Sequence, residues 1–412
     1  LAPMVDGSDL PYRLLLSNIT HAWTPMYNCK TILNNPKLAV TIMNSIQYEK
    51  ENTDHIVILQ FATNSVQDLQ NAYNLLKNNK ADFVEINFGC AQTIAQKGGY
   101  GSYLLDNLPL CYQLIKTLRD CSQKKISLKT RIFDQLHEFL AESINLGVEL
   151  ITLHGRLKGL KLGCYSGPVD YETVLKAFNF VDKKVNFVLN GGIFKPEQHQ
   201  YFLSQGVAGT MSATFLLQNP FLYGEGKQTN KQFQSLKTFT RQEIDEILQT
   251  ELQVQNQLSE KLQSYREKQQ LTITKTEYKQ YQFMQSYEGS MSADIQMRLE
   301  KEENLTKPEG ETLLYYQADL KIQILMQIIT LIDITEKCIE QQLEAPWSAL
   351  LSHVFQMIGR DLLSSNVDVR WWMGLKNEQG DDYDVYCQKK RSFMKAVAKL
   401  LINRILNGQN CQ

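Results

Sequence analysis

The 412-residue sequence lacks an apolar run long enough to cross a membrane, because a spanning helix needs about 20 mostly apolar residues. Its most apolar stretch, residues 313–334, is interrupted by glutamine, aspartate and lysine side chains. This pattern predicts a helix that packs against other helices, and it argues against a membrane protein.

Paired cysteines are missing as well. The eight cysteines are spread along the chain without a Cys-x-x-Cys spacing, which argues against a zinc site and against a disulfide framework. We therefore expect no metal and a reducing compartment, either the cytoplasm or the nucleus. The chain starts at Leu1 within a predicted strand, so we expect a segment upstream that would carry any targeting signal.

Neither sign of charge dominates. The net charge of the whole chain is −1, unlike that of a protein that binds bare phosphate backbone over its whole surface. By region, residues 1–224 carry +2, residues 225–345 carry −6 and residues 346–412 carry +3. A surface that binds RNA should therefore avoid the middle region.

What the sequence does contain is a regular alternation of short apolar runs and amphipathic stretches over residues 1–224. This alternation is typical of repeated βα units. The eight predicted strands indicate an α/β fold, a (β/α)8 TIM barrel followed by an all-helical C-terminal domain, with the active site at the carboxyl ends of the strands. The predicted strands are residues 1–5, 24–27, 55–61, 83–88, 126–132, 150–154, 185–190 and 209–213.

The most informative segment follows the predicted strand at residues 83–88. Gly89 allows a sharp turn that places Cys90 at the carboxyl end of this strand. The glycines at 98, 99 and 101 would let the next loop move over a ligand as a lid does. On its own, Cys90 fits a small buried apolar residue equally well.

Two later strands and two glycine-rich loops add further candidates. Lys129 lies inside an otherwise apolar strand, where an unpaired lysine is costly, and this favours a functional role. His154 at the end of the next strand would, by itself, more often be structural. The small residues at 190–193 and 208–213 would let backbone amides approach phosphate oxygens, although such residues are also ordinary in turns.

The segment Asn87-x-Gly-Cys-x-Gln92, followed by Lys97-Gly-x-Tyr-Gly101, closely resembles the catalytic loop of the tRNA-dihydrouridine synthases, a family of FMN-dependent reductases. This chain departs from the family at Ala91, where proline is usual, so we expect a less rigid loop. The resemblance implies that NADPH or NADH reduces FMN and that FMN then passes hydride to C6 of a uridine. Cys90 would donate the proton to C5.

The resemblance covers most of residues 1–224 in the expected order. It implies that the flavin ring and its phosphate contact the cofactor-binding residues Pro3, Met4, Val5, Gln60, Lys129, His154, Asn190, Gly191, Gly192, Ser212 and Ala213. It also implies that Asn87 and Arg156 bind the substrate. A lysine ammonium near N1 and O2 would stabilise the negative charge of a reduced flavin.

From about residue 221 the pattern changes to long polar helices. We predict three units: an FMN-binding catalytic barrel at residues 1–224, an acidic helical insertion or linker at 225–345, and a helical tRNA-binding tail at 346–412. The insertion would begin with an amphipathic helix at 241–269, and residues 270–311 would form a linker.

The tail resembles the RNA-binding domain of the same family around residues 352–355 and 366–370. Its basic residues are predicted to share a face that contacts phosphate, although a solvated helix surface fits equally well. These residues are Lys389, Lys390, Arg391, Lys395, Lys399 and Arg404.

The catalytic loop looks most like that of the eukaryotic branch acting on D-loop positions 16 and 17. Two alternatives stay open at this point. An FMN-dependent barrel that reduces a small molecule, similar to dihydroorotate dehydrogenase, would not need the helical tail. A tRNA-binding protein without turnover would not need Cys90, Lys129 and His154 together. We expect tRNA as the partner and a monomeric protein.

Overall fold

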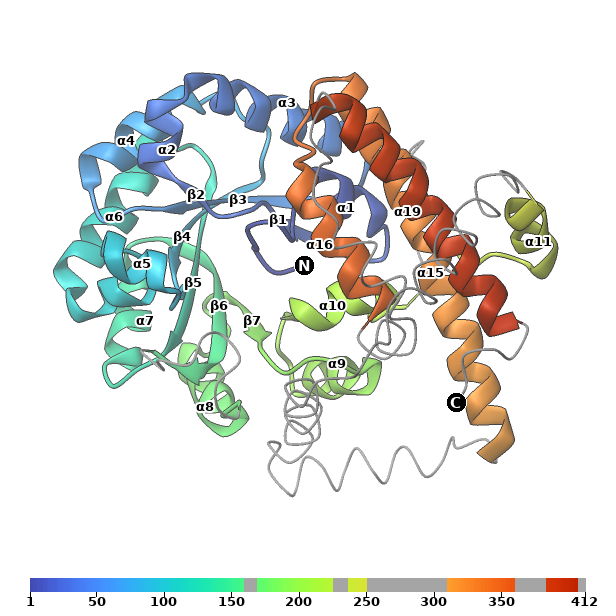
Figure 1. The fold of residues 1–412 in the computed structure, drawn as a ribbon. Helices are drawn as coiled ribbons and strands as arrows, with labels where there is room; N and C mark the ends of the chain where they lie inside the picture. The colour runs from blue at the N-terminus through green and yellow to red at the C-terminus, as the bar shows by residue number, and fades with distance from the viewer. Residues whose placement is uncertain (159–168, 225–235, 250–309, 360–382, 407–412) are drawn as a thin grey trace.

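A computed structural model describes residues 1–158, 169–224, 236–249, 310–359 and 383–406. Most of the predicted linker at 270–311 lies outside these residues, as does the motif at 366–370. Figure 1 shows a ring of parallel strands wrapped by helices, with a group of long C-terminal helices packed on one side. The predicted TIM barrel with a helical C-terminal part is therefore confirmed.

The strands form one sheet in which every neighbouring pair is parallel, in the order β1-β3-β4-β5-β6-β7-β8, with β2 also paired to β3. Their bounds are β1 His21–Trp23, β2 Tyr27–Asn28, β3 Ile56–Ala62, β4 Phe83–Phe88, β5 Lys125–Ile132, β6 Val148–Leu157, β7 Asn186–Asn190 and β8 Gly209–Met211. Parallel strands joined by helices carry their loops, and hence their functional residues, at one end of the barrel.

The first two predicted strands need correction. Residues 1–5 form no strand, but Ala2 donates its N–H to Ser212 O at 3.0 Å and the Leu1 amino group donates to His21 O at 3.2 Å. This extended segment therefore fills the gap between β8 and β1, and Pro3 has no N–H with which to continue a ladder. Of the strand predicted at 24–27, only Tyr27 lies in a strand, β2, and Pro25 stands in the gap between β1 and β2, where its missing N–H interrupts the pairing.

Helices cover the outside of the sheet. They are α1 Leu10–Leu15, α2 Cys29–Asn34, α3 Pro36–Asn52, α4 Val66–Leu75, α5 Thr93–Gly98, α6 Leu108–Cys121, α7 Leu136–Asn145, α8 Tyr171–Val181, α9 Pro196–Ser204 and α10 Thr214–Gln218, with a 3-10 helix at Gly101–Asp106. Several begin at a side-chain cap: Ser65 accepts from Asp68 N, Asn107 from Leu110 N and Asp170 from Thr173 N. Such caps satisfy backbone donors that a helix start leaves open.

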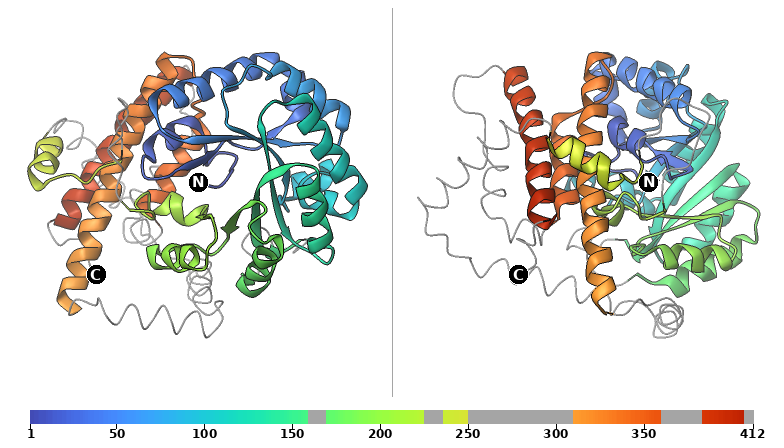
Figure 2. Two further views of the ribbon diagram at one scale, coloured as in Figure 1. Left: turned by 180° about the vertical axis from the view of Figure 1, so that it is seen from behind. Right: turned by 90° about the vertical axis from the view of Figure 1, so that its right-hand side faces the viewer.

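The C-terminal part is built on α15 Gly310–Glu340, which packs against α16 Trp347–Ile358, α19 Tyr383–Leu406 and α1 of the barrel. Figure 2 shows these long helices side by side along one flank of the barrel, with α11 Arg241–Gln249 outside them. The apolar stretch 313–334 lies within α15, so the helix predicted there is confirmed. None of the described helices is long and apolar enough to cross a membrane.

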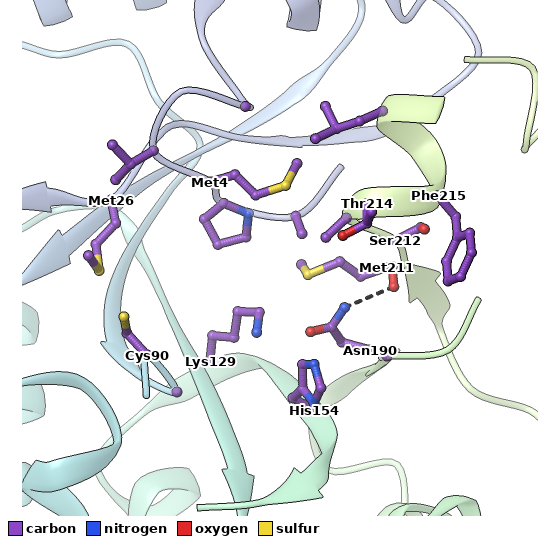
Figure 3. Close-up of a pocket in the computed structure, with 18 of the residues that line it drawn as sticks. Met4, Met26, Cys90, Lys129, His154, Asn190, Met211, Ser212, Thr214 and Phe215 are labelled. Atoms are coloured by element: carbon purple, nitrogen blue, oxygen red, sulfur yellow. Dashed lines mark hydrogen bonds between the residues drawn. The ribbon is translucent and has the colours of Figure 1, made fainter. Parts of the chain in front are cut away.

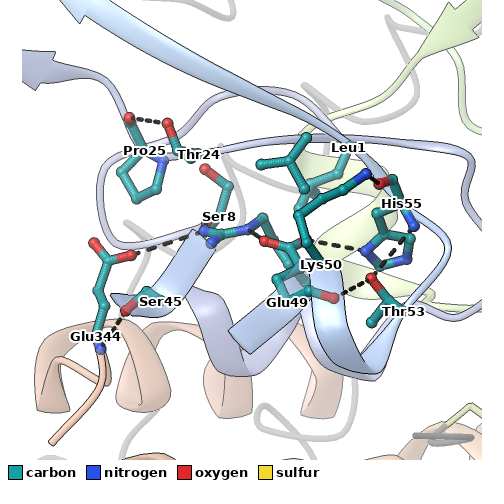
Figure 4. A network of polar contacts seen from close by, with 12 residues as sticks. Leu1, Ser8, Thr24, Pro25, Ser45, Glu49, Lys50, Thr53, His55 and Glu344 are labelled. Carbon is teal, nitrogen blue, oxygen red and sulfur yellow. Dashed lines mark hydrogen bonds and ion pairs between the residues drawn. The ribbon is translucent and has the colours of Figure 1, made fainter. Parts of the chain in front are cut away.

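A buried polar network joins the two parts (Figure 4). Arg13 Nε lies 2.8 Å from Glu49 Oε2, and neither side chain is exposed. Glu344, between α15 and α16, accepts from Tyr27 Oη at 2.6 Å and donates its backbone N–H to Ser45 Oγ at 2.9 Å. The α15–α16 connection is therefore hydrogen-bonded directly to the barrel. The division of the chain into three functional units, with boundaries at residues 225 and 346, stays a prediction.

Candidate active site at the carboxyl ends of the strands

The interior of the barrel carries both apolar and polar side chains. Side chains on each strand alternate between the interior and the helices. A separate apolar cluster comprises Ala2, Trp23, Ile58, Phe83, Leu150, Val188 and Met211. In β4, Glu85 and Asn87 follow Phe83 on the same face at two-residue spacing, so this strand becomes polar toward its carboxyl end.

A cavity of about 390 Å³ opens at this polar end, within the size range of cofactor pockets. Of the predicted site residues it is lined by Pro3, Met4, Val5, Asn87, Cys90, Lys129, His154, Arg156, Asn190, Gly191, Gly192, Ser212 and Ala213. In the close-up, Met4 lies across the cavity from Lys129 and His154, with Cys90 and Phe215 on opposite sides (Figure 3). The barrel thus brings together all of the predicted site residues except Gln60.

Asn87 fixes the turn that carries Cys90. Its Oδ1 accepts from Gly89 N at 3.0 Å and from Cys90 N at 2.8 Å, and its Nδ2 donates to Gln60 Oε1 at 2.8 Å. The Cys90 carbonyl accepts from Ser102 N and Ser102 Oγ. Cys90 is half-buried on the cavity wall. Its position is therefore set by hydrogen bonds from both sides of the loop.

The glycine loop after Cys90 is folded back onto it. Gly101 has φ +68°, and a Cβ at this position would lie 2.5 Å from the Cys90 carbonyl oxygen, so only glycine fits. Ala91, where the resembling family usually has proline, has its carbonyl bound by Tyr103 Oη at 3.2 Å. The lid movement and the lower rigidity predicted for this loop stay predictions.

A buried carboxylate that was not among the predicted site residues lies below the cavity. Glu85 accepts from Trp23 Nε1 at 2.9 Å, from Gln60 Nε2 at 2.6 Å and from Ser127 Oγ. Burial raises its pKa, although these donors and nearby Lys129 oppose the shift. The one signal for Glu85 in the sequence was its acidic side chain inside an apolar strand, two positions before Asn87.

Gln60 belongs to this lower layer. Its side chain is fully buried, does not line the cavity, and bridges Glu85 and Asn87. The structure therefore places Gln60 below the cavity, where it supports Asn87, rather than on the wall where a flavin contact was predicted. The order of residues in the sequence could not distinguish a position on the cavity wall from one in the layer below it.

Lys129 is buried at the register position beside Asn87. Burial lowers the pKa of its ammonium to about 8, and Arg131 adds to the lowering, whereas Glu85 and Cys90 oppose it. Among the described residues Lys129 has neither a hydrogen bond nor an ion pair within 4 Å. A buried cation of this kind favours an anionic group in the cavity.

Further basic side chains surround Lys129. Arg131, which was not among the predicted site residues, donates from Nε to Gly89 O at 2.6 Å, and it lines the cavity together with Arg156. Burial and these three cations hold the pKa of His154 well below its usual value, so its imidazole is neutral. Asp6 is the one acidic residue among the described lining residues. The cavity is therefore electropositive.

The loops after β7 and β8 are held in place by side chains of two residues from the segments predicted to bind phosphate through their backbone amides. Asn190 Nδ2 donates to Met211 O at 2.9 Å, and Ser212 Oγ donates to Ile193 O at 2.8 Å. Gly191 has φ +103° and Gly192 has φ +71°, and a Cβ on Gly192 would lie 2.3 Å from Tyr171 Oη. Only glycine fits here, so the bare backbone forms this part of the cavity wall.

A model described as Dihydrouridine synthase (Dus) matches residues 1–316 of this chain. The chain belongs to the dihydrouridine synthase family. The resemblance seen in the sequence is thereby confirmed.

Several curated members of the dihydrouridine synthase family are similar to this chain. The tRNA-dihydrouridine(16/17) synthase of Saccharomyces cerevisiae is 32% identical over 266 residues, covering 63% of this chain and 60% of that protein. The Schizosaccharomyces pombe protein of the same name is 28% identical, covering 54% and 56%. A mouse tRNA-dihydrouridine(20a/20b) synthase-like protein is 29% identical, covering 55% and 69%. The chain thus spans about 60% of the length of the S. cerevisiae relative.

Similarity to solved structures is weaker. A mandelate oxidase structure matches with a TM-score of 0.36 and 11% identity, covering 52% of this chain and 63% of that one. This similarity is too low to inform function.

The cavity of this dihydrouridine synthase family member fits flavin mononucleotide. The buried Lys129 ammonium suits the electron-rich side of a reduced flavin. His154 Nδ1 is buried and has no hydrogen-bond partner among the described residues, so it too can bind a ligand. The bare backbone at Gly191 and Gly192 suits a phosphate. Among the described residues no cluster of three potential metal ligands occurs.

The helical part contributes to the cavity of this family member in a way that the sequence did not indicate. Ser352 and Gln356 of α16 line the cavity, facing residues more than 100 positions earlier in the chain. Ser352 belongs to the motif at 352–355 that resembles an RNA-binding domain, and no local pattern marks Gln356. That both residues line the cavity depends on how α16 packs against the barrel.

The basic face predicted for α19 is wrong for the three of its residues whose side chains are described. Lys395 pairs with Asp333 and Glu336 of α15, Arg391 pairs with Glu336, and Lys399 is only 3% exposed. Arg391 and Lys395 face α15, because Asp333 and Glu336 lie on the side of α15 that packs against α19. These two cations link the two helices, and Lys399 is buried, so none of the three forms a free phosphate-binding surface.

Proposed function

We propose that this protein reduces a uridine of tRNA to 5,6-dihydrouridine, using flavin mononucleotide and a nicotinamide cofactor, NADPH or NADH. The observation that carries the proposal is the meeting of Cys90 and the buried cation Lys129 on the wall of one electropositive cavity. The names of the curated relatives support the same reaction.

Flavin mononucleotide, when bound, supplies the hydride that C6 of the uracil ring receives. Cys90 supplies the proton that C5 receives, and the bonds from Asn87 and Ser102 hold its backbone in place for this transfer. Lys129 holds positive charge beside the cofactor, and Arg131 and Arg156 add to the field that attracts the anionic cofactor and RNA. A base must leave its stack to reach such a site.

The position of the uridine is proposed from the relatives. Proteins from S. cerevisiae, S. pombe, rat and mouse that carry 16/17 in their names resemble this chain, and relatives with 20a/20b in their names also match. We propose positions 16 and 17 first. A monomeric state and a cytoplasmic or nuclear location stay predictions from the sequence.

The proposal is tested by nucleoside mass spectrometry of an unmodified tRNA incubated with the protein, FMN and NADPH. The decisive variant is Cys90→Ala. Cys121→Ala is the matched control, because Cys121 is also a half-buried free cysteine but lies at the end of α6, outside the cavity. We expect dihydrouridine from the wild type and from Cys121→Ala, and at least about a hundredfold less from Cys90→Ala.

Each alternative outcome has a distinct meaning. Equal product from both cysteine variants would remove Cys90 as the proton donor. A flavin that binds and is reduced, but yields no dihydrouridine on either an unmodified or a naturally modified tRNA, would reject the proposed substrate in favour of a small molecule. Absence of flavin binding would reject the reductase altogether.

A further inference from the structure

Helix α16 touches the cavity loop at residues 3–9 at two points, and this loop forms one wall of the cavity. His353 Nε2 lies 2.5 Å from Asp9 Oδ1, and the two side chains are 0% and 4% exposed. Ser348 Oγ, more than one turn earlier on α16, donates to Asp6 Oδ1 at 2.8 Å. The middle and the last residue of this loop are thus tied to the helical part.

The cavity loop needs such support. Asp6 has φ +54°, a left-handed conformation that is unfavourable for a residue with a side chain. Inside the loop, Gly7 N and Ser8 N both donate to Met4 O, and Ser8 Oγ bonds the Met4 backbone. The loop is therefore a tight turn, and strained turns persist only where their surroundings hold them.

His353 also connects to α10, a second element of the cavity wall. Its ring stacks on Tyr12, with ring centroids 4.1 Å apart and an interplanar angle of 9°. Tyr12 Oη in turn donates to Leu216 O of α10 at 2.6 Å, and α10 contributes several lining residues. His353 of the helical part thus contacts both Asp9 of the cavity loop and Tyr12, which is hydrogen-bonded to α10.

The same helix forms a third wall. Ser352, directly before His353, and Gln356, three residues after it, both line the cavity. His353 meets Asp9 between these two lining residues and the cavity loop, so it lies where α16 packs against that loop.

We propose that His353 is a positioning residue for the site. Acting through Asp9, it holds the cavity loop against α16, so that the flavin-binding wall reaches its shape only when the helical part is seated. This inference rests on the proposed function in that it takes the ligand to be flavin mononucleotide.

The test separates the hydrogen bond of His353 from its packing. His353→Gln can keep a donor toward Asp9 but loses the ring, whereas His353→Phe keeps a ring on Tyr12 but loses the donor. The measurement is the dissociation constant of FMN, from quenching of its fluorescence, together with the flavin absorption spectrum. We expect roughly tenfold weaker binding and a shifted spectrum for His353→Phe, and near wild-type values for His353→Gln.

Two further variants guard against a simple loss of folding. Ser348→Ala removes only the exposed bond to Asp6 and should weaken FMN binding severalfold in a folded protein. Ser45→Ala removes a bond between the barrel and the α15–α16 connection that lies away from the cavity, and it should leave FMN binding unchanged.

The outcomes distinguish this inference from the proposed function. If His353→Phe and Ser348→Ala both bind FMN as tightly as the wild type does, the positioning role is overturned and the reductase proposal stays intact. Loss of binding in His353→Gln with retention in His353→Phe would show that packing on Tyr12 matters instead. A wild-type protein that binds no FMN would reject the proposed function, and this inference with it.

Discussion

The Asn87 side chain accepts the Cys90 backbone N–H at 2.8 Å, and this bond sets where the cysteine enters the cavity. The same side chain is anchored by Gln60, which is held in turn by Glu85. The proposed proton donor is therefore positioned by a chain of buried hydrogen bonds that reaches down into the barrel.

An Asn87→Ala variant should lose this positioning. We expect the rate of dihydrouridine formation under saturating tRNA and FMN to fall by about a hundredfold, because a small misplacement of a reacting group is enough to do so. Single-turnover nucleoside analysis would measure it. Thr93→Ala is the control, since Thr93 is exposed at the start of α5, three residues after Cys90, and does not line the cavity. An unchanged rate in Asn87→Ala would contradict the role of this bond.

Burial of Lys129 should make the stability of the ligand-free protein depend on alkaline pH. The pKa of its ammonium is about 8 in the fold and about 10.4 in an unfolded chain. Between these values the unfolded chain holds more protons, so the stability contributed by this group rises with pH.

We therefore expect the free energy of unfolding of the wild type, minus that of Lys129→Met, to increase by roughly 2–3 kcal/mol from about pH 8 to about pH 10.5. Urea unfolding across that range measures it. Lys30→Met, at an exposed lysine of α2, is the control and should give a flat difference. A flat difference for Lys129→Met as well would show that its ammonium is not desolvated.

Breaking the buried ion pair of Arg13 and Glu49 by removing one charge should be strongly destabilising. Glu49 also bonds His55 Nδ1 at 3.0 Å. A Glu49→Gln variant leaves the Arg13 guanidinium buried without its closest charged partner, which costs about 3–5 kcal/mol. Denaturant unfolding at neutral pH would measure this, with Glu51→Gln, exposed on the same helix, as the control. A cost below about 1 kcal/mol would contradict the expectation.

Gly192 should be required for binding of the cofactor phosphate. A Gly192→Ala variant combines φ +71° with a collision at Tyr171 Oη, whereas Gly206→Ala has φ +93° but no atom closer than 3.6 Å. We expect at least about tenfold weaker FMN binding for Gly192→Ala and unchanged affinity for Gly206→Ala. Equal losses in both would indicate a general effect of backbone strain, and the proposed phosphate site would then need revision.

Much of the barrel and its site could be predicted from the sequence, because the signals are local. Alternating apolar runs specify strands, and a glycine after such a run places Cys90 at the strand end. Residues at the carboxyl ends of parallel strands converge whatever the details of packing. This is why Lys129, His154 and the Gly191–Gly192 turn, although far apart in the sequence, meet in one cavity as predicted.

What depends on packing depth or on distant contacts was decided only by the tertiary structure. Gln60 and Glu85 lie one layer below the cavity, and Pro25 stands in the gap between β1 and β2, so only Tyr27 of the strand predicted at 24–27 lies in a strand. Lys395 faces the acids of α15 because two helices pack along that side. The contact of His353 with Asp9 joins residues 344 positions apart. No local periodicity encodes such a pairing, since it arises only when separately specified elements bury their faces against one another.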